Sequence, residues 1–199
     1  MTATGYEVLG STERFSNKVF RLVSDEVRMP EGDSAARDYL KHVGSVAAVA
    51  MDFPPELPAG RVLLIRQYRH AVRGEMWELP AGLTDEAGER PVDSARRELA
   101  EETDLTAARW DLLVEIHSSP GCSDELIRVY LARDVADVPV ADRHHRVGEE
   151  AGLTTTWVPL DDAVRMVQSG EITNATCVTG VLAAAGARDA GWAPLRPAD

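Results

Sequence analysis

The alternation of apolar and polar residues along the first part of the chain predicts strands. Residues 6–29 include the segment KVFRLV, in which apolar and polar side chains alternate, as in a hairpin or a small sheet. Residues 30–33, PEGD, are predicted to form a turn. The runs VGSVAAVAM within residues 39–51 and RVLLIR at residues 61–66 are mostly apolar, which is typical of strands buried on both faces.

The rest of the chain mixes helical and strand-like patterns. Apolar residues recur with helical spacing at about 92–103, from Asp161 onwards and across 173–187. Residues 112–116, 126–131 and 155–160 are strand-like, and we expect the strand at 155–160 to be the last. Residues 134–152 are polar and are expected to form a surface loop. Strands interleaved with helices predict an α/β fold, a mixed sheet covered on both faces. We expect a strand-rich N-terminal arm at residues 1–44 and a main domain at residues 45–199.

Composition narrows the class of protein. The chain has 199 residues, 44% of them hydrophobic, enough for one domain with a sizeable core. The sequence contains no run near the ~20 apolar residues of a membrane span, and its start, MTATGYEVLG, does not resemble a signal peptide. Cys122 and Cys177 are far apart and form no CxxC motif, so neither a disulfide framework nor a zinc site is indicated. We expect a cytoplasmic protein with no membrane partner and, at a net charge of −12, no nucleic-acid partner.

Candidate chemistry is concentrated in the segment RELAEE at residues 97–102. Glu98 and Glu102 are four residues apart and Glu101 lies three after Glu98, so the three carboxylates share one helix face. Like charges at this spacing destabilise a helix unless a cation lies between them. A hard divalent ion such as magnesium prefers oxygen ligands and meets this need. The alternative is a solvated acidic face, and the neighbouring residues argue against it.

Those neighbours complete a strand–turn–helix pattern. Gly82 follows the strand-like segment MWELPA and allows a sharp turn close to a ligand. Glu89 lies eight residues before Arg97 and is a candidate bidentate partner that fixes the loop to the helix. Ala95 and Leu99 give the helix an apolar stripe that can pack on a sheet. Together these residues predict a cation site.

Residues 82–105 resemble the signature of the Nudix hydrolases, which cleave nucleoside diphosphates linked to another group. The positions that match in type and spacing are Glu89, Arg97, Glu98, Leu99, Glu101, Glu102 and Leu105. Two features depart from it: six residues rather than five separate Gly82 from Glu89, and Asp104 replaces the closing glycine. Position 104 is expected to be a left-handed helix cap, where aspartate is tolerated less well than glycine. Neither change removes a carboxylate, so we expect a modest stability cost and intact chemistry.

The resemblance covers about residues 45–185 and implies an α/β/α sandwich. It also implies two or three Mg²⁺ ions as cofactors, with Mn²⁺ as a substitute. By this resemblance Glu98 and Glu102 are the principal metal ligands, the Ala81 carbonyl is a further ligand and Glu101 shares in the coordination.

Diphosphate hydrolysis also requires an activated water. In similar enzymes the base is a glutamate in a loop well after the signature. Glu149 and Glu150 occupy the matching place ahead of Trp157, and Glu149 is the favoured candidate. The alternative is an acidic patch on a mobile loop.

A downstream proline narrows the substrate. Pro120 lies sixteen residues after Asp104, in SSPGCSDE, and this resembles the ADP-ribose pyrophosphatase branch, in which the loop borders the pocket for the terminal ribose and adenosine. The alternative is a tight Pro-Gly turn between two strands. The resemblance implies hydrolysis of ADP-ribose to AMP and ribose 5-phosphate. The competing functions are hydrolysis of another nucleoside diphosphate sugar, such as GDP-mannose, and ligand sensing without catalysis.

The segments RQYRH and WELPAG strengthen this likeness and supply candidate substrate contacts. Arg66 and Arg69 could clamp phosphate or pair with surface acids. Trp77 could stack on adenine or belong to the core, and Glu78 beside it is a further candidate. Similar pyrophosphatases exchange N-terminal arms in a homodimer, so the arm at residues 1–44 suggests a homodimer.

Overall fold

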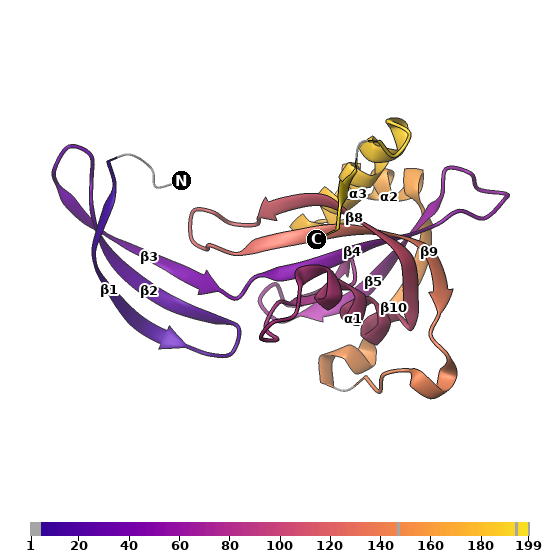
Figure 1. Cartoon of the computed structure of the whole chain (residues 1–199), viewed down its shortest axis with the longest axis horizontal. Coiled ribbons are helices and arrows are strands. Elements are labelled where there is room, and N and C mark those ends of the chain that lie inside the picture. Colours follow the sequence, from indigo (N-terminus) through magenta and orange to yellow (C-terminus); the bar gives the residue numbers. More distant parts are fainter. Residues whose placement is uncertain (1–4, 147, 194, 199) are drawn as a thin grey trace. The chain divides into compact units, whose positions relative to one another are not determined.

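The central strand β4 (Ser45–Asp52) is buried on both faces, as its apolar sequence predicts. The structure is a computed structural model that describes residues 5–146, 148–193 and 195–198, with residues 149 and 150 described by their backbone alone. Figure 1 shows the chain coloured along its sequence. The other elements are β1 (Glu7–Ser16), β2 (Phe20–Arg28), β3 (Ser34–His42), β5 (Arg61–Arg69), β6 (Gly74–Glu78), β7 (Ala81–Leu83), α1 (Pro91–Thr103), β8 (Leu105–His117), β9 (Leu126–Asp137), η1 (Val140–Asp142), η2 (Gly148–Gly152), β10 (Thr154–Pro159), α2 (Leu160–Gln168), α3 (Ala175–Asp189) and β11 (Arg196–Pro197).

The chain divides into two compact units, the first of which comprises residues 1–44 and 117–126. Its strands β1, β2 and β3 form an antiparallel sheet in that order. The loop between β8 and β9 joins the edge of this sheet, because the backbone N–H of Leu40 donates to the Cys122 carbonyl at 2.8 Å and that of Asp124 donates to the Leu40 carbonyl at 3.1 Å. This unit therefore combines the first three strands with a loop from later in the chain.

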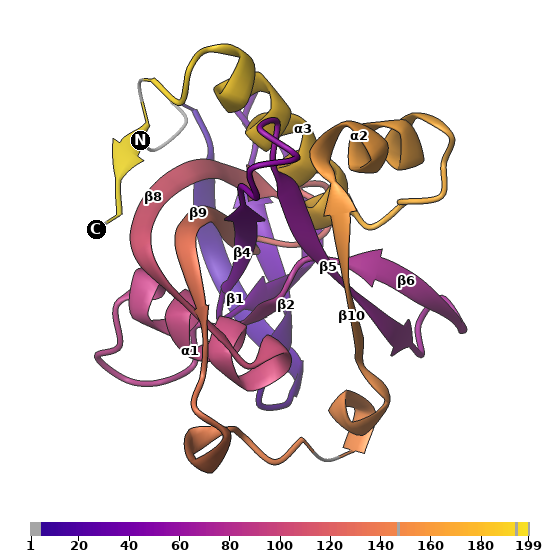
Figure 2. The same cartoon turned by 90° about the vertical axis from the view of Figure 1, so that its right-hand side faces the viewer.

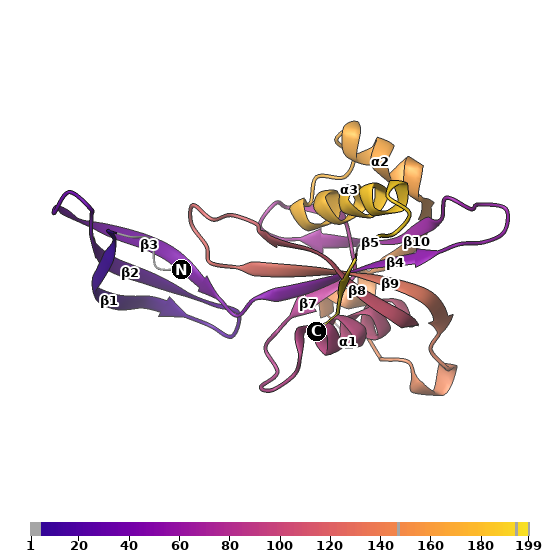
Figure 3. The same ribbon diagram turned by 45° about the horizontal axis from the view of Figure 1, so that its top comes forward.

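The second unit, residues 45–116 and 127–199, is built on a mixed sheet. Its strands lie in the order β10-β5-β4-β9-β8-β11, and Figure 2 shows the first five of them side by side. In addition, β6 pairs with β5 and β7 pairs with β4. The pair β4–β9 is parallel, whereas β4–β7 is antiparallel. Figure 3 shows α1 on one face of the sheet and α2 and α3 on the other. The predicted α/β/α sandwich is therefore confirmed.

Apolar side chains fill both faces of this sheet. Because successive residues of a strand point to opposite faces, Val46 of β4 packs in the cluster that contains Leu99 of α1. Val49 of the same strand packs in the cluster that contains Leu160 of α2 and Val181 of α3. The core on the α1 side fixes that helix against β4, and this positions the predicted carboxylates.

The helix α1 begins and ends where the sequence predicts. Pro91 occupies the first turn, where its missing N–H costs no hydrogen bond. Ala95 and Leu99 are buried against the sheet. After Thr103 the chain enters the left-handed region at Asp104, with φ 57° and ψ 29°. The predicted left-handed cap is therefore confirmed.

Two predictions for the later part of the chain are wrong. Residues 134–152 are not a plain loop: β9 continues to Asp137, because Val135 still packs against the core, and η1 and η2 follow. The strand predicted at 155–160 ends at Pro159 and is not the last, since the two residues of β11 pair with β8. Two residues are too few to produce a recognisable alternation. Among the described residues, no helix has both the length and the apolar character required to cross a membrane.

Candidate metal and catalytic site

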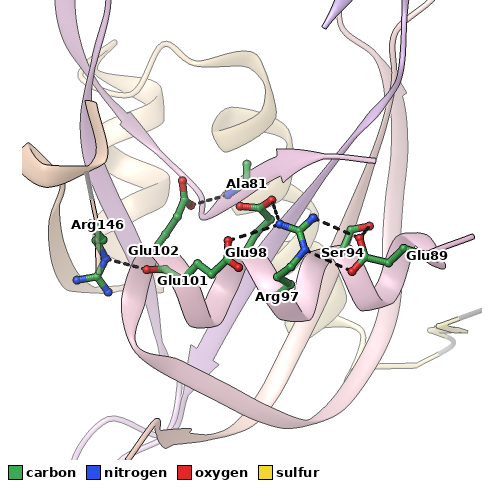
Figure 4. A network of polar contacts seen from close by, with 8 residues as sticks. All are labelled: Ala81, Glu89, Ser94, Arg97, Glu98, Glu101, Glu102 and Arg146. Atoms are coloured by element: carbon green, nitrogen blue, oxygen red, sulfur yellow. Dashed lines mark hydrogen bonds and ion pairs between the residues drawn. The ribbon is translucent and has the colours of Figure 1, made fainter. Parts of the chain in front are cut away.

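Glu102 lies where α1 meets β7. Its side chain is only 4% exposed, and its carboxylate accepts a hydrogen bond of 2.9 Å from the backbone N–H of Ala81 (Figure 4). A buried carboxylate is costly unless hydrogen bonds or a cation compensate for lost hydration. The fold therefore holds an acidic group directly beside the predicted turn.

Glu98 lies against the backbone of β7 at Gly82. A Cβ atom at position 82 would stand 2.0 Å from Cδ and 2.1 Å from Oε1 of Glu98, well inside van der Waals contact. The absence of a side chain at Gly82 therefore creates the space for the carboxylate. The sequence predicts that the backbone at Gly82 lies close to a ligand; in the structure its close neighbour is Glu98, a candidate metal ligand.

Arg97 connects the loop before α1 to the acidic face of the helix (Figure 4). Its guanidinium donates to the two carboxylate oxygens of Glu89 at 3.3 and 3.2 Å, and to Glu98 at 2.6 Å. Glu101 lies 3.5 Å away. Ser94, which is fully buried, donates a further hydrogen bond of 2.7 Å to Glu89. The two-pronged contact between Arg97 and Glu89 confirms the prediction from their spacing.

These contacts change the ionisation of both partners. Hydrogen bonds from Arg97 and Ser94 lower the pKa of Glu89 and outweigh the opposing effect of desolvation. Burial by itself lowers the pKa of Arg97, but the carboxylates of Glu89 and Glu98 outweigh burial and raise it. Both groups are therefore charged at neutral pH, and the loop remains tied to the helix.

The additional residue in the loop before α1 does not separate Glu89 from Arg97. The loop contains a turn in which the N–H of Glu89 donates to the Glu86 carbonyl at 3.2 Å. Gly88 in this turn has a φ of 86°, a conformation that favours glycine. The turn accommodates the longer connection, so this departure from the signature leaves the Arg97 contacts intact.

In the part of the chain that the structure describes, no three acidic, histidine or cysteine side chains converge as a ready-made metal site. Glu98 and Glu101 contact Arg97, whereas Glu102 contacts Ala81. Arg97 thus places one positive charge beside two of the three carboxylates. The donor set still fits a hard divalent ion, because its groups are oxygens from one face of α1 and Gly82 leaves room for Glu98.

Four candidate substrate residues, Arg66, Arg69, Trp77 and Glu78, lie on the paired strands β5 and β6. Arg69 forms a bidentate ion pair with the buried carboxylate of Glu78, at 2.9 and 2.7 Å. The guanidinium of Arg66 lies 5.3 Å from the ring centre of Trp77 and pairs with Glu75 at 3.1 Å. Trp77 also packs against the core. Both arginines therefore have acidic partners. The partner of Arg66 is an exposed acid, the alternative that the sequence left open, whereas the partner of Arg69 is buried. Trp77 contributes to packing.

The remaining candidates come from two loops. Pro120 belongs to the first unit and lies in a tight turn, in which the N–H groups of Cys122 and Ser123 donate to the Ser119 carbonyl at 3.0 and 2.9 Å. The backbone of Glu149 and Glu150 forms part of η2. Their side chains lie outside the described part of the chain, so their assignment as the base stays a prediction.

Two residues at the site were not predicted. Ser94, in the first turn of α1, donates a hydrogen bond to Glu89. Because the two residues are only five positions apart, their spacing in the sequence could have indicated this contact. Arg146 donates to the Glu101 carbonyl at 2.8 Å (Figure 4). The two residues are 45 positions apart, and a contact of this separation leaves no local pattern. The lack of a basic residue in the last turn of α1 was the only hint of a distant partner.

The fold and the carboxylate-bearing helix together define a hydrolase that uses a divalent metal ion. The chain belongs to the Nudix family, because the family model described as NUDIX domain matches residues 43–177. It is 42% identical over its whole length to an ADP-ribose pyrophosphatase of Mycobacterium tuberculosis, of which it covers 92%. It is 31% identical to an ADP-ribose pyrophosphatase of Bacillus subtilis, over 85% of this chain and 86% of the relative. The chain also resembles the crystal structure of an ADP compounds hydrolase, with a TM-score of 0.77 and 17% sequence identity. The match covers 96% of this chain and 98% of the hydrolase chain, which shows a shared fold.

Proposed function

We propose that this chain hydrolyses the diphosphate of ADP-ribose to AMP and ribose 5-phosphate in the presence of Mg²⁺. The observation that carries the proposal is the contact of Glu98 with Gly82, beside the buried Glu102. This arrangement supports the chemistry of diphosphate cleavage. The names of the two relatives with 42% and 31% identity support ADP-ribose as the substrate.

The proposed metal ligands are the carboxylates of Glu98 and Glu102, with the Ala81 carbonyl and Glu101 as further ligands. Two or three Mg²⁺ ions, or Mn²⁺ in their place, would neutralise phosphate charge and lower the pKa of a bound water. Arg97 contacts Glu98 and Glu101. The same guanidinium keeps its contact with Glu89, which anchors the loop before the helix.

Glu149 is the proposed base that takes a proton from the attacking water, with Glu150 as the second candidate. Arg66 and Trp77 are the proposed contacts for phosphate and adenine, because cation and ring already lie together on β5 and β6. Arg69 and Glu78 are further proposed substrate contacts. The buried carboxylate of Glu78 accepts two hydrogen bonds from Arg69 and holds its guanidinium in one orientation. Pro120 is a further proposed substrate contact.

A substrate panel tests this function. We expect ADP-ribose to give the highest kcat/KM when compared with GDP-mannose and NADH at millimolar Mg²⁺, measured by release of AMP or GMP. Chelation by EDTA should remove turnover of every substrate. If ADP-ribose is the poorest substrate, the assignment to the ADP-ribose branch is wrong. Binding of ADP-ribose without turnover, with Mg²⁺ present, indicates a sensing module instead.

We also propose that the chain is a homodimer through its N-terminal sheet. The side chains of Tyr6, Val8, Leu9 and Phe15 are between 41% and 59% exposed. Val8, Leu9 and Phe15 belong to β1 and Tyr6 directly precedes it. A concentration of exposed apolar side chains in one segment is typical of an interaction surface. Exchange of such arms between two copies would cover these side chains.

Sedimentation equilibrium tests the oligomeric state. We expect a mass of twice the 21.6 kDa of one chain. Phe15→Lys should shift the protein towards monomer, because a charge at a buried contact is costly. Val140→Lys is the matched control, since Val140 is 79% exposed and lies in η1, far along the chain from the arm. A monomer mass for the unmodified chain would contradict the proposal.

A further inference from the structure

The C-terminal end of α1 is neutralised by an arginine from a distant part of the chain. The helix has no basic residue in its own last turn. Arg146 donates from Nε to the Glu101 carbonyl at 2.8 Å, and its Nη2 lies 2.8 Å from Oδ2 of Asp104. The two side chains are 24% and 21% exposed. One guanidinium therefore contacts a carbonyl of the last helical turn and the residue that ends the helix.

Taken alone, Asp104 is an unfavourable residue for its position. Its left-handed backbone, with φ 57°, costs aspartate more than it would cost glycine. Its carboxylate also lies at the negative end of the helix dipole. Glycine, which the family signature has here, would avoid both costs. Stability of α1 alone therefore does not account for the aspartate.

The contacts of Asp104 and Arg146 lead into the connection between β9 and β10. The carbonyl of Asp104 accepts a hydrogen bond of 2.8 Å from the N–H of Val138. Further along, Arg143 donates from Nε to the Val138 carbonyl at 3.2 Å. The connection is thus fastened to the end of α1 near its start by the backbone hydrogen bond of Val138, and at Arg146 by the ion pair with Asp104. The Arg143 contact lies within the connection.

The segment that follows Arg146 carries the candidate base. Glu149 is three residues after Arg146 and Glu150 is four residues after it. Since an extended chain spans at most about 3.5 Å per residue, their Cα atoms lie within roughly 11 to 14 Å of that of Arg146. At the other end, Thr154 of β10 pairs with β5. The segment is therefore held at both ends, by α1 and by the sheet.

We propose that Asp104 and Arg146 are positioning residues, which fasten the loop of Glu149 and Glu150 to the helix that carries the candidate metal ligands. The proposal rests on the proposed function, in which one of these glutamates is the base. The tether limits how far the backbone of this loop can move away from α1. Loss of the tether lowers kcat and leaves KM nearly unchanged, because the candidate substrate contacts on β5 and β6 are not altered.

Asp104→Gly is the most informative variant. Glycine is favoured in the left-handed conformation, so the substitution removes the carboxylate without straining the helix end. We expect kcat for ADP-ribose to fall about ten- to a hundredfold, the scale of loss for a misplaced catalytic group, with KM within about twofold. Arg146→Gln should give the same loss. Arg146→Lys should restore part of the activity, because lysine keeps the charge but lacks the fork that makes both contacts.

Hydrogen exchange of residues 143–152, followed by mass spectrometry, gives a measurement that does not depend on turnover. Both Asp104→Gly and Arg146→Gln should accelerate exchange in this segment. The matched control is Arg188→Gln, which removes an ion pair of 2.6 Å with Asp161 between α3 and α2. This control should change neither kcat nor exchange at residues 143–152.

The outcomes separate the tether from the proposed function. Unchanged kcat in both Asp104→Gly and Arg146→Gln overturns the positioning role. If the unmodified chain does not hydrolyse ADP-ribose, the proposed function is wrong, and hydrogen exchange alone decides on the tether. Unchanged exchange in both variants then refutes it. A rise in KM with kcat preserved also refutes it, because it would indicate a role in substrate binding.

Discussion

Replacing Glu102 with glutamine is expected to lower the turnover of ADP-ribose by about a thousandfold, the scale at which loss of one preorganised electrostatic partner is felt. Glutamine has nearly the same volume and keeps an oxygen that can accept the 2.9 Å hydrogen bond from the Ala81 N–H. Folding should therefore be retained. What glutamine lacks is the negative charge, and a neutral amide is a weak ligand for a hard cation.

The measurement pairs steady-state kinetics with a binding titration. Glu102→Gln should require a much higher Mg²⁺ or Mn²⁺ concentration for half-saturation, and its thermal unfolding should stay close to that of the unmodified chain. Glu86→Gln makes the same chemical change at an exposed position of the loop before α1 and should preserve activity. Near-normal turnover of Glu102→Gln would exclude Glu102 from the proposed ligands.

Local spacing explains why the centre of the site could be predicted. The carboxylates at intervals of three and four residues fix their own placement on α1, because helix geometry repeats over this distance. The eight-residue interval between Glu89 and Arg97 spans only one loop and one helical turn, and their contact follows from it. The left-handed conformation of Asp104 follows from its place directly after the helix.

Contacts between distant segments left no such pattern. The Arg146 contact with α1 joins residues that are 45 positions apart. The pairing of Arg69 with Glu78 depends on the register of β5 and β6, which the sequence does not specify. The loop at Cys122 joins the edge of β3 through backbone hydrogen bonds. Because nearly every residue type has these backbone groups, the sequence does not indicate this contact. Sequence reasoning therefore recovered the helix and its acidic face, but not the tertiary contacts that fasten them.

Introducing a single methyl group at Gly82 is expected to lower kcat about a hundredfold while the fold is preserved. The added Cβ would lie 2.0 to 2.5 Å from Cδ, Oε1 and Cγ of Glu98. These atoms are the far end of a flexible side chain, so Glu98 can rotate away at little cost to stability. The backbone of Gly82 is not in the left-handed region, so alanine adds no strain there. Displacement of a proposed metal ligand by an ångström or more accounts for the size of the loss.

Gly186→Ala is the matched control for this substitution. Position 186 lies inside α3 and has open space around an added Cβ, so alanine there should raise the free energy of unfolding by about 0.5–1 kcal/mol and leave kcat unchanged. Thermal unfolding and kinetics of the two alanine variants separate a packing defect from loss of the site. If Gly82→Ala retains full kcat and normal Mg²⁺ dependence, the position of Glu98 against β7 is not required. Glu98 is then not a principal ligand, because a ligand cannot be moved from its place without affecting the ion that it holds.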